Sequence, residues 1–290
     1  MRKGGLGMQF SGLSLIVLMI CFLTLISCSS SNRTFQIKKS EEFAAQPIKS
    51  KPVLNKEDIS YLPACVQKYL IYTGAIGKSK PQNMYIEFDA LMYRKPGDQP
   101  MKSHSEQYNF FEKYSRLFLM KAGKMGIPFK ALHIYKDGQA SFQVKVADLF
   151  RVVDINGEEL TTAETVTLLN DICIFAPGNL VDDRMTWTEI DSLSARVTFI
   201  NGKYVVSAIL YFNETGELIN FMSDDRSALQ DDGKMKQVRW TTPVSNYKTI
   251  EGRKIPACGK TIWHYPEGDF IYGEFELKKI KYNVTENITE

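Results

Sequence analysis

The fold is decided by the stretch Ala140-Ser141-Phe142-Gln143-Val144-Lys145-Val146, in which apolar and polar side chains alternate. A period of two is that of a β-strand with one face on a core and the other in water. The pair Asp137-Gly138 just before it, and Asn201-Gly202 further on, are residue pairs that favour tight β-hairpin turns. The stretch and its turns therefore predict an antiparallel sheet.

The same pattern extends outward over most of the chain. We expect about ten strands, some of them merged from these segments: 84–93, 105–113, 115–122, 128–136, 139–147, 184–190, 194–201, 203–213, 217–225, 235–241, 258–265 and 269–282. The predicted fold class is mainly β (α+β), a large curved antiparallel sheet or half-barrel with two packed helices.

Two segments carry helical rather than strand spacing. In the first, Leu62, Val66 and Leu70 recur every four residues, and Gly74 ends the run. The second runs from about Thr162 to Ile174, before a Pro177-Gly178 break, and Thr161 or Thr162 with Glu164 resembles a capping box at its start. Both helices are expected to pack on the sheet.

One predicted strand is apolar on both faces. It reads Tyr204-Val205-Val206-Ser207-Ala208-Ile209-Leu210-Tyr211-Phe212. A sheet with one wet face does not favour such a strand, so either helices cover one side or the sheet curls around an apolar hollow.

The N-terminus has the pattern of a secretion signal. Arg2 and Lys3 precede an almost wholly apolar run over residues 13–26, which is short for a membrane span. The run ends in Leu25-Ile26-Ser27-Cys28, which resembles the lipobox of bacterial lipoproteins. We expect residues 1–27 to be a lipoprotein signal peptide and Cys28 to be the lipid attachment residue. An ordinary signal peptide and an anchor helix are the alternatives.

The remaining chain divides into two parts. Residues 28–54 are rich in Ser, Lys, Gln, Glu and Pro and are expected to be a flexible tether, and residues 55–290 to be a single antiparallel β-rich domain. By the sorting rule known for enteric bacteria, Ser29 after the cysteine favours the outer membrane, with the domain in the periplasm or at the surface.

Composition excludes some function classes. The formal charge of +3 falls to +1 when Arg2 and Lys3 are removed, which is not the footprint of a nucleic-acid binder. Cys65, Cys173 and Cys258 lack metal-ligand or redox spacing and are expected to be small buried hydrophobes without a disulfide. No cofactor or metal site is predicted.

Few residues suggest chemistry. His104, His133 and His264 lie in no metal-binding spacing, and no nucleophile elbow or phosphate-binding loop is present. His133 is in phase with apolar neighbours, as a buried hydrogen-bonded histidine would be. The residues proposed to line a ligand-binding hollow are Tyr211, Phe221, Arg226, Trp240 and Trp263. Core packing explains the aromatic residues equally, and a surface ion pair explains Arg226 with Asp225.

Several segments resemble a family of uncharacterised bacterial proteins, known only as a domain of unknown function. The segments are Tyr61 to Leu70 with Gly74, Asp137-Gly138, the Thr165 to Pro177 helix and its exit, Trp187 to Arg196, Asp225-Arg226, and Tyr247 to Pro256. The resemblance covers nearly all of residues 60–283 and implies no established activity. The segment Tyr247 to Pro256 also resembles, more weakly, part of the LolA/LolB lipoprotein carriers, which implies a half-barrel that holds acyl chains.

Three functions are compatible with the sequence. The first is a membrane-anchored envelope lipoprotein, not an enzyme, whose curved sheet binds an apolar or amphiphilic ligand such as a lipid. The second is a hydrolase that uses Arg226 with Asp225 or His133 in a cleft. The third is a structural or partner-binding envelope module with an exposed sheet edge. The oligomeric state is not predicted.

Overall fold

The computed structural model describes residues 30–124 and 126–286, so the predicted signal peptide and Cys28 lie outside the described residues. The helices are α2 (Ser31–Ala45), α3 (Ala64–Tyr72) and α4 (Glu158–Phe175), with short 3-10 helices η1 (Glu57–Ile59) and η2 (Pro177–Leu180). The strands are β1 (Asn83–Met92), β2 (Met101–Phe110), β3 (Ser115–Lys124), β4 (Ile127–Lys136), β5 (Gln139–Val146), β6 (Phe150–Asn156), β7 (Met185–Asp191), β8 (Ser194–Asn201), β9 (Tyr204–Phe212), β10 (Leu218–Ser223), β11 (Ser227–Leu229), β12 (Met235–Gln237), β13 (Arg239–Thr241), β14 (Val244–Ile250), β15 (Arg253–Tyr265) and β16 (Gly268–Tyr282).

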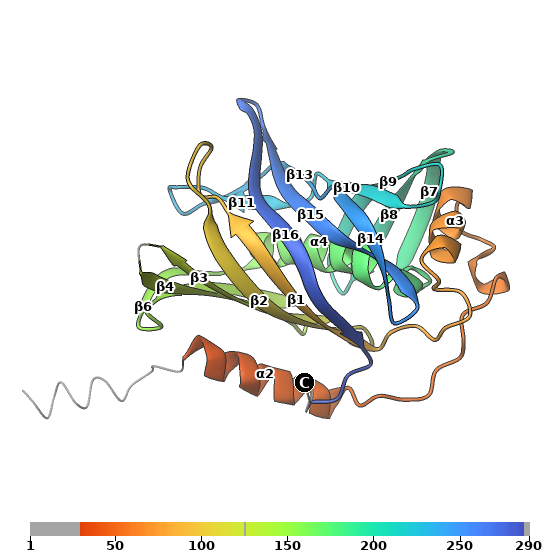
Figure 1. The fold of residues 1–290 in the computed structure, drawn as a ribbon, viewed down its shortest axis with the longest axis horizontal. Coiled ribbons are helices and arrows are strands. Elements are labelled where there is room, and N and C mark those ends of the chain that lie inside the picture. The colour runs from red at the N-terminus through yellow and green to blue at the C-terminus, as the bar shows by residue number, and fades with distance from the viewer. Residues whose placement is uncertain (1–29, 125, 287–290) are drawn as a thin grey trace, which may run out of the picture.

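One antiparallel sheet of 14 strands dominates the described chain, in the order β6-β5-β4-β3-β2-β1-β16-β15-β13-β10-β9-β8-β7, with β14 on β15. Strands β1 to β6 and β7 to β10 are two consecutive meanders, and the pairing of β16 with β1 connects them through β15 and β13. The sheet is open, with β6 and β7 at its edges. Figure 1 shows that it is strongly curved, which confirms the predicted fold class.

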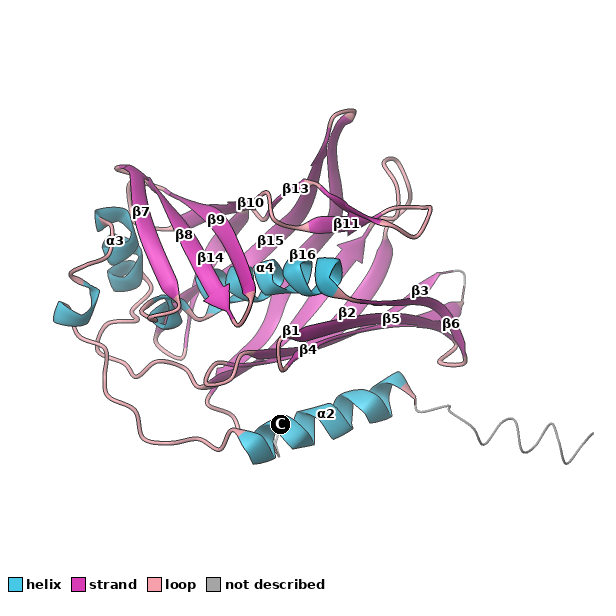
Figure 2. Ribbon diagram, turned by 180° about the vertical axis from the view of Figure 1, so that it is seen from behind, coloured by secondary structure: helices cyan, strands magenta, loops and turns pink. Residues whose placement is uncertain are grey.

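Helix α4 connects the two sheet edges across the concave side (Figures 1 and 2). All but three of its 18 residues are buried, because strands from both meanders contact it. The helix begins after Gly157, whose φ of +106° suits glycine, and ends before Pro177. It is longer than the predicted 162–174. Thr161 is therefore not a cap: its hydroxyl lies inside the helix and donates to Gly157 O.

The position of strand β9 in the fold explains why its sequence is apolar on both faces. Val206, Ala208, Leu210 and Phe212 are buried on the face toward α4, with which β9 makes one of the helix's largest contacts. Residues on the other face are half-buried or exposed, and Val205 is 58% exposed. Of the two explanations for such a strand, helix cover accounts for one face. The other face is open to solvent over part of its length.

Residues 30–54 differ from the expected flexible tether. Helix α2 packs on the convex side of the sheet, where Phe35 is fully buried among residues such as Tyr108 and Phe110. Glu42 is also buried there and accepts hydrogen bonds from Ser115 Oγ and Gln46 Nε2, both at 2.6 Å. The helix was not predicted because its isolated sequence is polar. Its stability comes from partners on the sheet rather than from its own periodicity.

Other differences are local. Strands β6, β11 and β14 were not predicted, since each is short or lies next to a turn. The predicted helix around residues 55–74 is the pair η1 and α3.

Cys65 and Cys173 are buried and Cys258 is half-buried, each as a free thiol. Burial raises the pKa of the Cys65 and Cys173 thiols. Within the described residues, every helix is too short or too polar to cross a membrane.

Candidate functional site

A cavity of about 840 Å³ lies between α4 and the concave face of the sheet. Its walls are mostly aromatic and aliphatic, and they include Phe88, Phe118, Phe142, Trp240, Trp263, Tyr272 and Phe275. The volume falls in the range of about 300–1,000 Å³ that is usual for small-molecule sites. The concave side is therefore filled only in part by the chain's own helix.

Helix α4 forms one wall of the cavity with a single face. The residues on that face recur at three and four positions and are Leu160, Ala163, Glu164, Thr167, Asn170, Asp171 and Ile174. Two carboxylates, Glu164 and Asp171, are thus placed two turns apart on the buried part of the helix. Buried carboxylates need charged or hydrogen-bonding partners, and strands of both meanders supply them.

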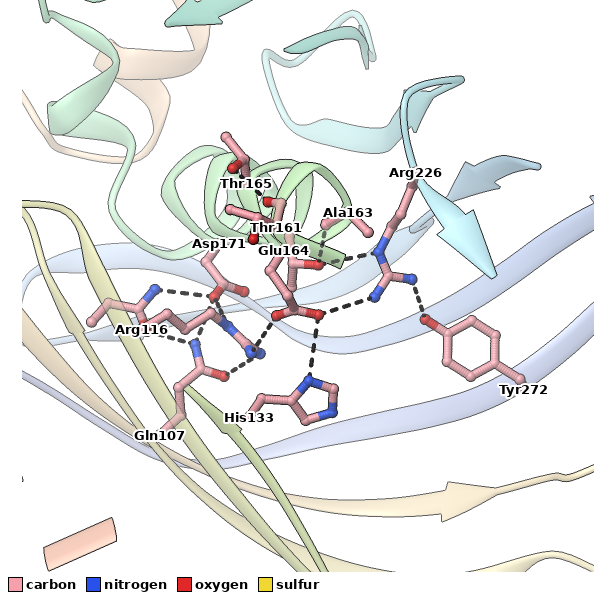
Figure 3. Close-up of polar contacts among 12 residues, drawn as sticks. Gln107, Arg116, His133, Thr161, Ala163, Glu164, Thr165, Asp171, Arg226 and Tyr272 are labelled. Atoms are coloured by element: carbon pink, nitrogen blue, oxygen red, sulfur yellow. Dashed lines mark hydrogen bonds and ion pairs between the residues drawn. The ribbon is translucent and has the colours of Figure 1, made fainter. Parts of the chain in front are cut away.

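Asp171 is held by the β2–β3 side of the sheet (Figure 3). Arg116 Nε donates to Asp171 Oδ2 at 2.7 Å, and Gln107 Nε2 donates to the same oxygen at 2.8 Å. Arg116 Nη2 also donates to Gln107 Oε1 at 3.1 Å. The three side chains are almost completely buried. Together with Asn109, whose amide also donates to Asp171 Oδ2 at 3.0 Å, they form a polar network that fixes the helix on the first meander.

Glu164 lies at the centre of the charged group. Its carboxylate is 3.4 Å from Arg116 Nη1, 3.4 Å from His133 Nδ1 and 3.9 Å from Arg226 Nη2, and its side chain is 3% exposed. Burial by itself raises the pKa of a carboxyl. The facing charges of His133, Arg116 and Arg226 outweigh burial and lower the pKa of Glu164 to about 2. The contact with His133 has ion-pair distance without hydrogen-bond geometry, and the imidazole ring stacks on Phe142.

Arg226 fixes the opposite side of Glu164. Its Nε donates to Thr167 Oγ1 at 3.1 Å. Its Nη1 donates to Tyr272 OH, also at 3.1 Å (Figure 3). Its guanidinium carbon lies 4.2 Å from the ring centre of Trp240 and 5.0 Å from that of Trp263, within the range of cation–π contacts. This arginine therefore belongs to the cavity wall, rather than to a surface ion pair.

The residues proposed from the sequence separate into two groups. Arg226, Trp240 and Trp263 come together in the cavity wall. Phe221 is fully buried outside that wall and contacts Trp240 from the side. Tyr211 is half-buried on strand β9 and lies outside the cavity lining.

Of the hydrolase hypothesis, which joined Arg226 to Asp225 or His133, only the pair Arg226 and His133 comes together in the cavity wall. His133 and Arg226 both face Glu164, but Asp225 accepts hydrogen bonds from the backbone and the hydroxyl of Ser207. His264 contacts Asp269 and His104 contacts Asp89, both at exposed positions.

The acidic partners were not found from the sequence. Glu164 was interpreted as part of a capping box, and Asp171 was not singled out. The available signal was their spacing of seven residues in a helix whose other acids, Glu158 and Glu159, lie in its first turn. Such a spacing places two acids on one side of a helix.

Two loops border the cavity beyond the main sheet. One is the β1–β2 loop, with residues 93–96, and the other is the small β11–β12 hairpin. Lys95 Nζ lies 3.2 Å from Asp231 Oδ2, so an ion pair connects the loops, although both side chains are more than half exposed. This contact lies at the solvent side of the cavity.

Fold and site together define a class of protein in which an open, curved antiparallel sheet encloses a helix and a largely apolar cavity. The chain belongs to the family of unknown function DUF6544, whose family model matches residues 52–275. This confirms the family resemblance noted in the sequence. No sequence among the curated proteins matches this chain.

Three solved structures have a similar outline. A DUF1329 family protein from Desulfovibrio piger has 11% identity and a TM-score of 0.42, and the match covers 76% of this chain and 92% of that one. A putative outer membrane lipoprotein-sorting protein domain from Vibrio parahaemolyticus has 9% identity, a TM-score of 0.39 and coverages of 69% and 85%. A LolA superfamily protein from Nitrosomonas europaea has 10% identity, a TM-score of 0.39 and coverages of 75% and 93%. Each of these TM-scores is below 0.5, so the function proposed below rests on this chain's own residues.

Proposed function

We propose that the protein is a membrane-anchored envelope lipoprotein that holds an apolar or amphiphilic ligand, such as a lipid, in the cavity beside α4. The observation that carries the proposal is the cavity itself. Protein interiors are close-packed, with few voids larger than a water molecule. The cavity beside α4 is not such a void: it is partly open to solvent, and its volume of about 840 Å³ and its aromatic lining are those of a small-molecule site.

The lining favours a ligand with one polar end. Rings such as Trp263, Phe118 and Phe275 offer apolar contact, whereas the charged group around Glu164 occupies one part of the wall. Each charged side chain around Glu164 is already paired with another side chain of the protein. This charged group therefore orients a ligand without requiring that the ligand carry a charge. An acyl chain with a polar head matches this division of the surface.

Binding is tested with brominated fatty acid, which quenches tryptophan fluorescence at close contact. Trp240 and Trp263 line the cavity, so saturable quenching is expected in the purified full chain. Ala131→Phe fills the cavity from β4 and raises the Kd about tenfold or more. Ala44→Phe on the exposed part of α2 is the matched control and leaves the Kd unchanged. Quenching that does not saturate, together with the absence of a co-purified amphiphile in mass spectra, would refute the proposal.

The anchoring part of the proposal rests on the pattern Leu25-Ile26-Ser27-Cys28. Several acyl chains on one cysteine would hold the protein at a membrane, since each buried CH₂ contributes about 0.8 kcal/mol. Mass spectrometry of the mature N-terminus is expected to find acylated Cys28. Cys28→Ala abolishes the acyl mass, and an unmodified mature cysteine in the parent would contradict the anchor.

A further inference from the structure

Three large apolar side chains are exposed together at one end of the sheet. Leu149 and Phe150 are 65% and 70% exposed, and Ile127 is 48% exposed. Single exposed apolar side chains are ordinary on a protein surface, whereas a contiguous group marks a contact surface. We refer to these three residues as the apolar tip.

The backbone joins the tip into one surface. The β3–β4 and β5–β6 turns lie at the same end of the sheet, and Ala147 N–H donates to Pro128 O at 2.9 Å between them. Val146 pairs with Phe129 on one side and with Phe150 on the other. Paired residues in an antiparallel sheet share a face. Phe150 therefore continues the concave row to which the cavity residues of β4 belong.

The N-terminal end of α2 lies at the same place, as Figures 1 and 2 both show. Ser31 N–H donates to Asp148 Oδ1 at 3.0 Å, and Asp148 belongs to the β5–β6 turn. Cys28 precedes Ser31 by three residues, and three residues of extended chain span at most about 11 Å. A lipid on Cys28 would therefore enter a bilayer close to the apolar tip.

The charges beside the tip suit an anionic surface. Lys124 at the end of β3 and Arg33 in the first turn of α2 are exposed, and among the described residues they belong to no ion pair. Basic side chains next to exposed apolar ones are the combination that binds the interface of a membrane with anionic lipid.

We propose that the apolar tip contacts the lipid bilayer, so that the protein lies on the membrane in a fixed orientation rather than hanging from its anchor. The inference rests on the proposed anchoring at Cys28 and adds a second contact to it. Because the tip continues the concave face, this orientation sets the cavity side of the sheet next to the bilayer. An amphiphile could then pass between membrane and cavity over a short path.

The test uses the full chain in vesicles of phosphatidylethanolamine and phosphatidylglycerol whose acyl chains are brominated at different depths. Phe150→Trp adds one indole to the three of the parent, whose signal is subtracted. We expect bromines near the headgroups to quench the added fluorescence about twofold. The control is Val205→Trp, an apolar position with 58% exposure. Asn201, at the turn that leads into β9, contacts Tyr135 near the end of β4, so position 205 lies at that end of the sheet. This end of β4 is about 25 Å from the apolar tip. No quenching is expected at that site.

Equal quenching at positions 150 and 205 would overturn the proposal. A spin label attached at Leu149→Cys provides a second probe of depth. Its accessibility to oxygen must be higher in vesicles than in buffer without lipid or detergent. If Cys28 is acylated and the cavity binds fatty acid while the tip stays in water, only the tip proposal fails. If light scattering finds dimers that Phe150→Ser dissociates, the tip is a contact between copies and the bilayer proposal fails.

Discussion

At the scale of single residues, the charge on Glu164 has the clearest measurable consequence. Its pKa is about 2 in the folded chain and near the ordinary 4.5 when unfolded. A lowered folded pKa means that the carboxylate contributes stability above pH 4.5, and that this contribution is lost as the pH falls toward 2. The full contribution is about 3 kcal/mol by linkage.

Glu164→Gln should therefore reduce, by about 3 kcal/mol, the loss of stability between pH 5 and about 2 that the parent shows in urea unfolding. Other carboxyls with lowered pKa values, such as Asp182 and Asp148, supply the rest of that loss. At pH 7 the variant should be about 3 kcal/mol less stable, because buried Arg116 and Arg226 lose a counter-charge. Glu159→Gln, on the exposed first turn of the same helix, is the control and keeps the acid slope. An unchanged acid slope in Glu164→Gln would show that its folded pKa is ordinary.

The same scale shows what could be predicted of the site. Trp240, Trp263 and Arg226 were found because aromatic and arginine side chains stand out in a chain with few polar motifs. Glu164 and Asp171 were missed because their meaning depends on which strands face the helix. Arg116 and Gln107, more than 40 residues away in sequence, supply the partners. Local spacing contains no such information.

At the scale of elements, helix α2 depends on one buried ring. Phe35→Ala removes a fully buried side chain from the convex cluster and should cost about 3–4 kcal/mol in free energy of unfolding. Ile37→Ala, two residues on and 46% exposed, should change it by less than about 0.5 kcal/mol. Chemical denaturation measures both. Equal, small effects would mean that α2 does not pack on the sheet in solution.

Strands were easier to predict than α2. Period-two alternation identified β5 directly. The glycine turn at 137–138 set the register of β4 with β5, and the turn at 201–202 set that of β8 with β9. The residues Asp137 and Gly138 adopt φ of +52° and +67°, as the turn chemistry requires. Helix α2 lacks a clear apolar stripe, and α4 is apolar on most sides. In both cases the surrounding sheet, rather than the local pattern, decides the structure.

At the scale of the whole molecule, protection from hydrogen exchange should be uneven. Amides of α4 and of paired strands β1 and β16 are enclosed, so they should exchange only through global unfolding. The β11–β12 hairpin has three-residue strands outside the main sheet and should open locally. Native-state exchange read by mass spectrometry checks this. Bound fatty acid should slow exchange in the hairpin, which borders the cavity. Fast exchange in α4 would contradict the enclosed position.

The pairing of β1 with β16 also determines when the sheet can be completed during folding. Asn83 bonds to Val284 across 201 residues of sequence, so the two meanders cannot join until the last strand has emerged during synthesis or export. Contacts between such distant residues form slowly because closing a long chain segment is entropically unfavourable. Until then, the edges of β1 and β15 remain open to other chains. Pairing of the final strand, β16, is thus the late step of folding. A chain that crosses a membrane unfolded would therefore not complete its sheet before it has crossed.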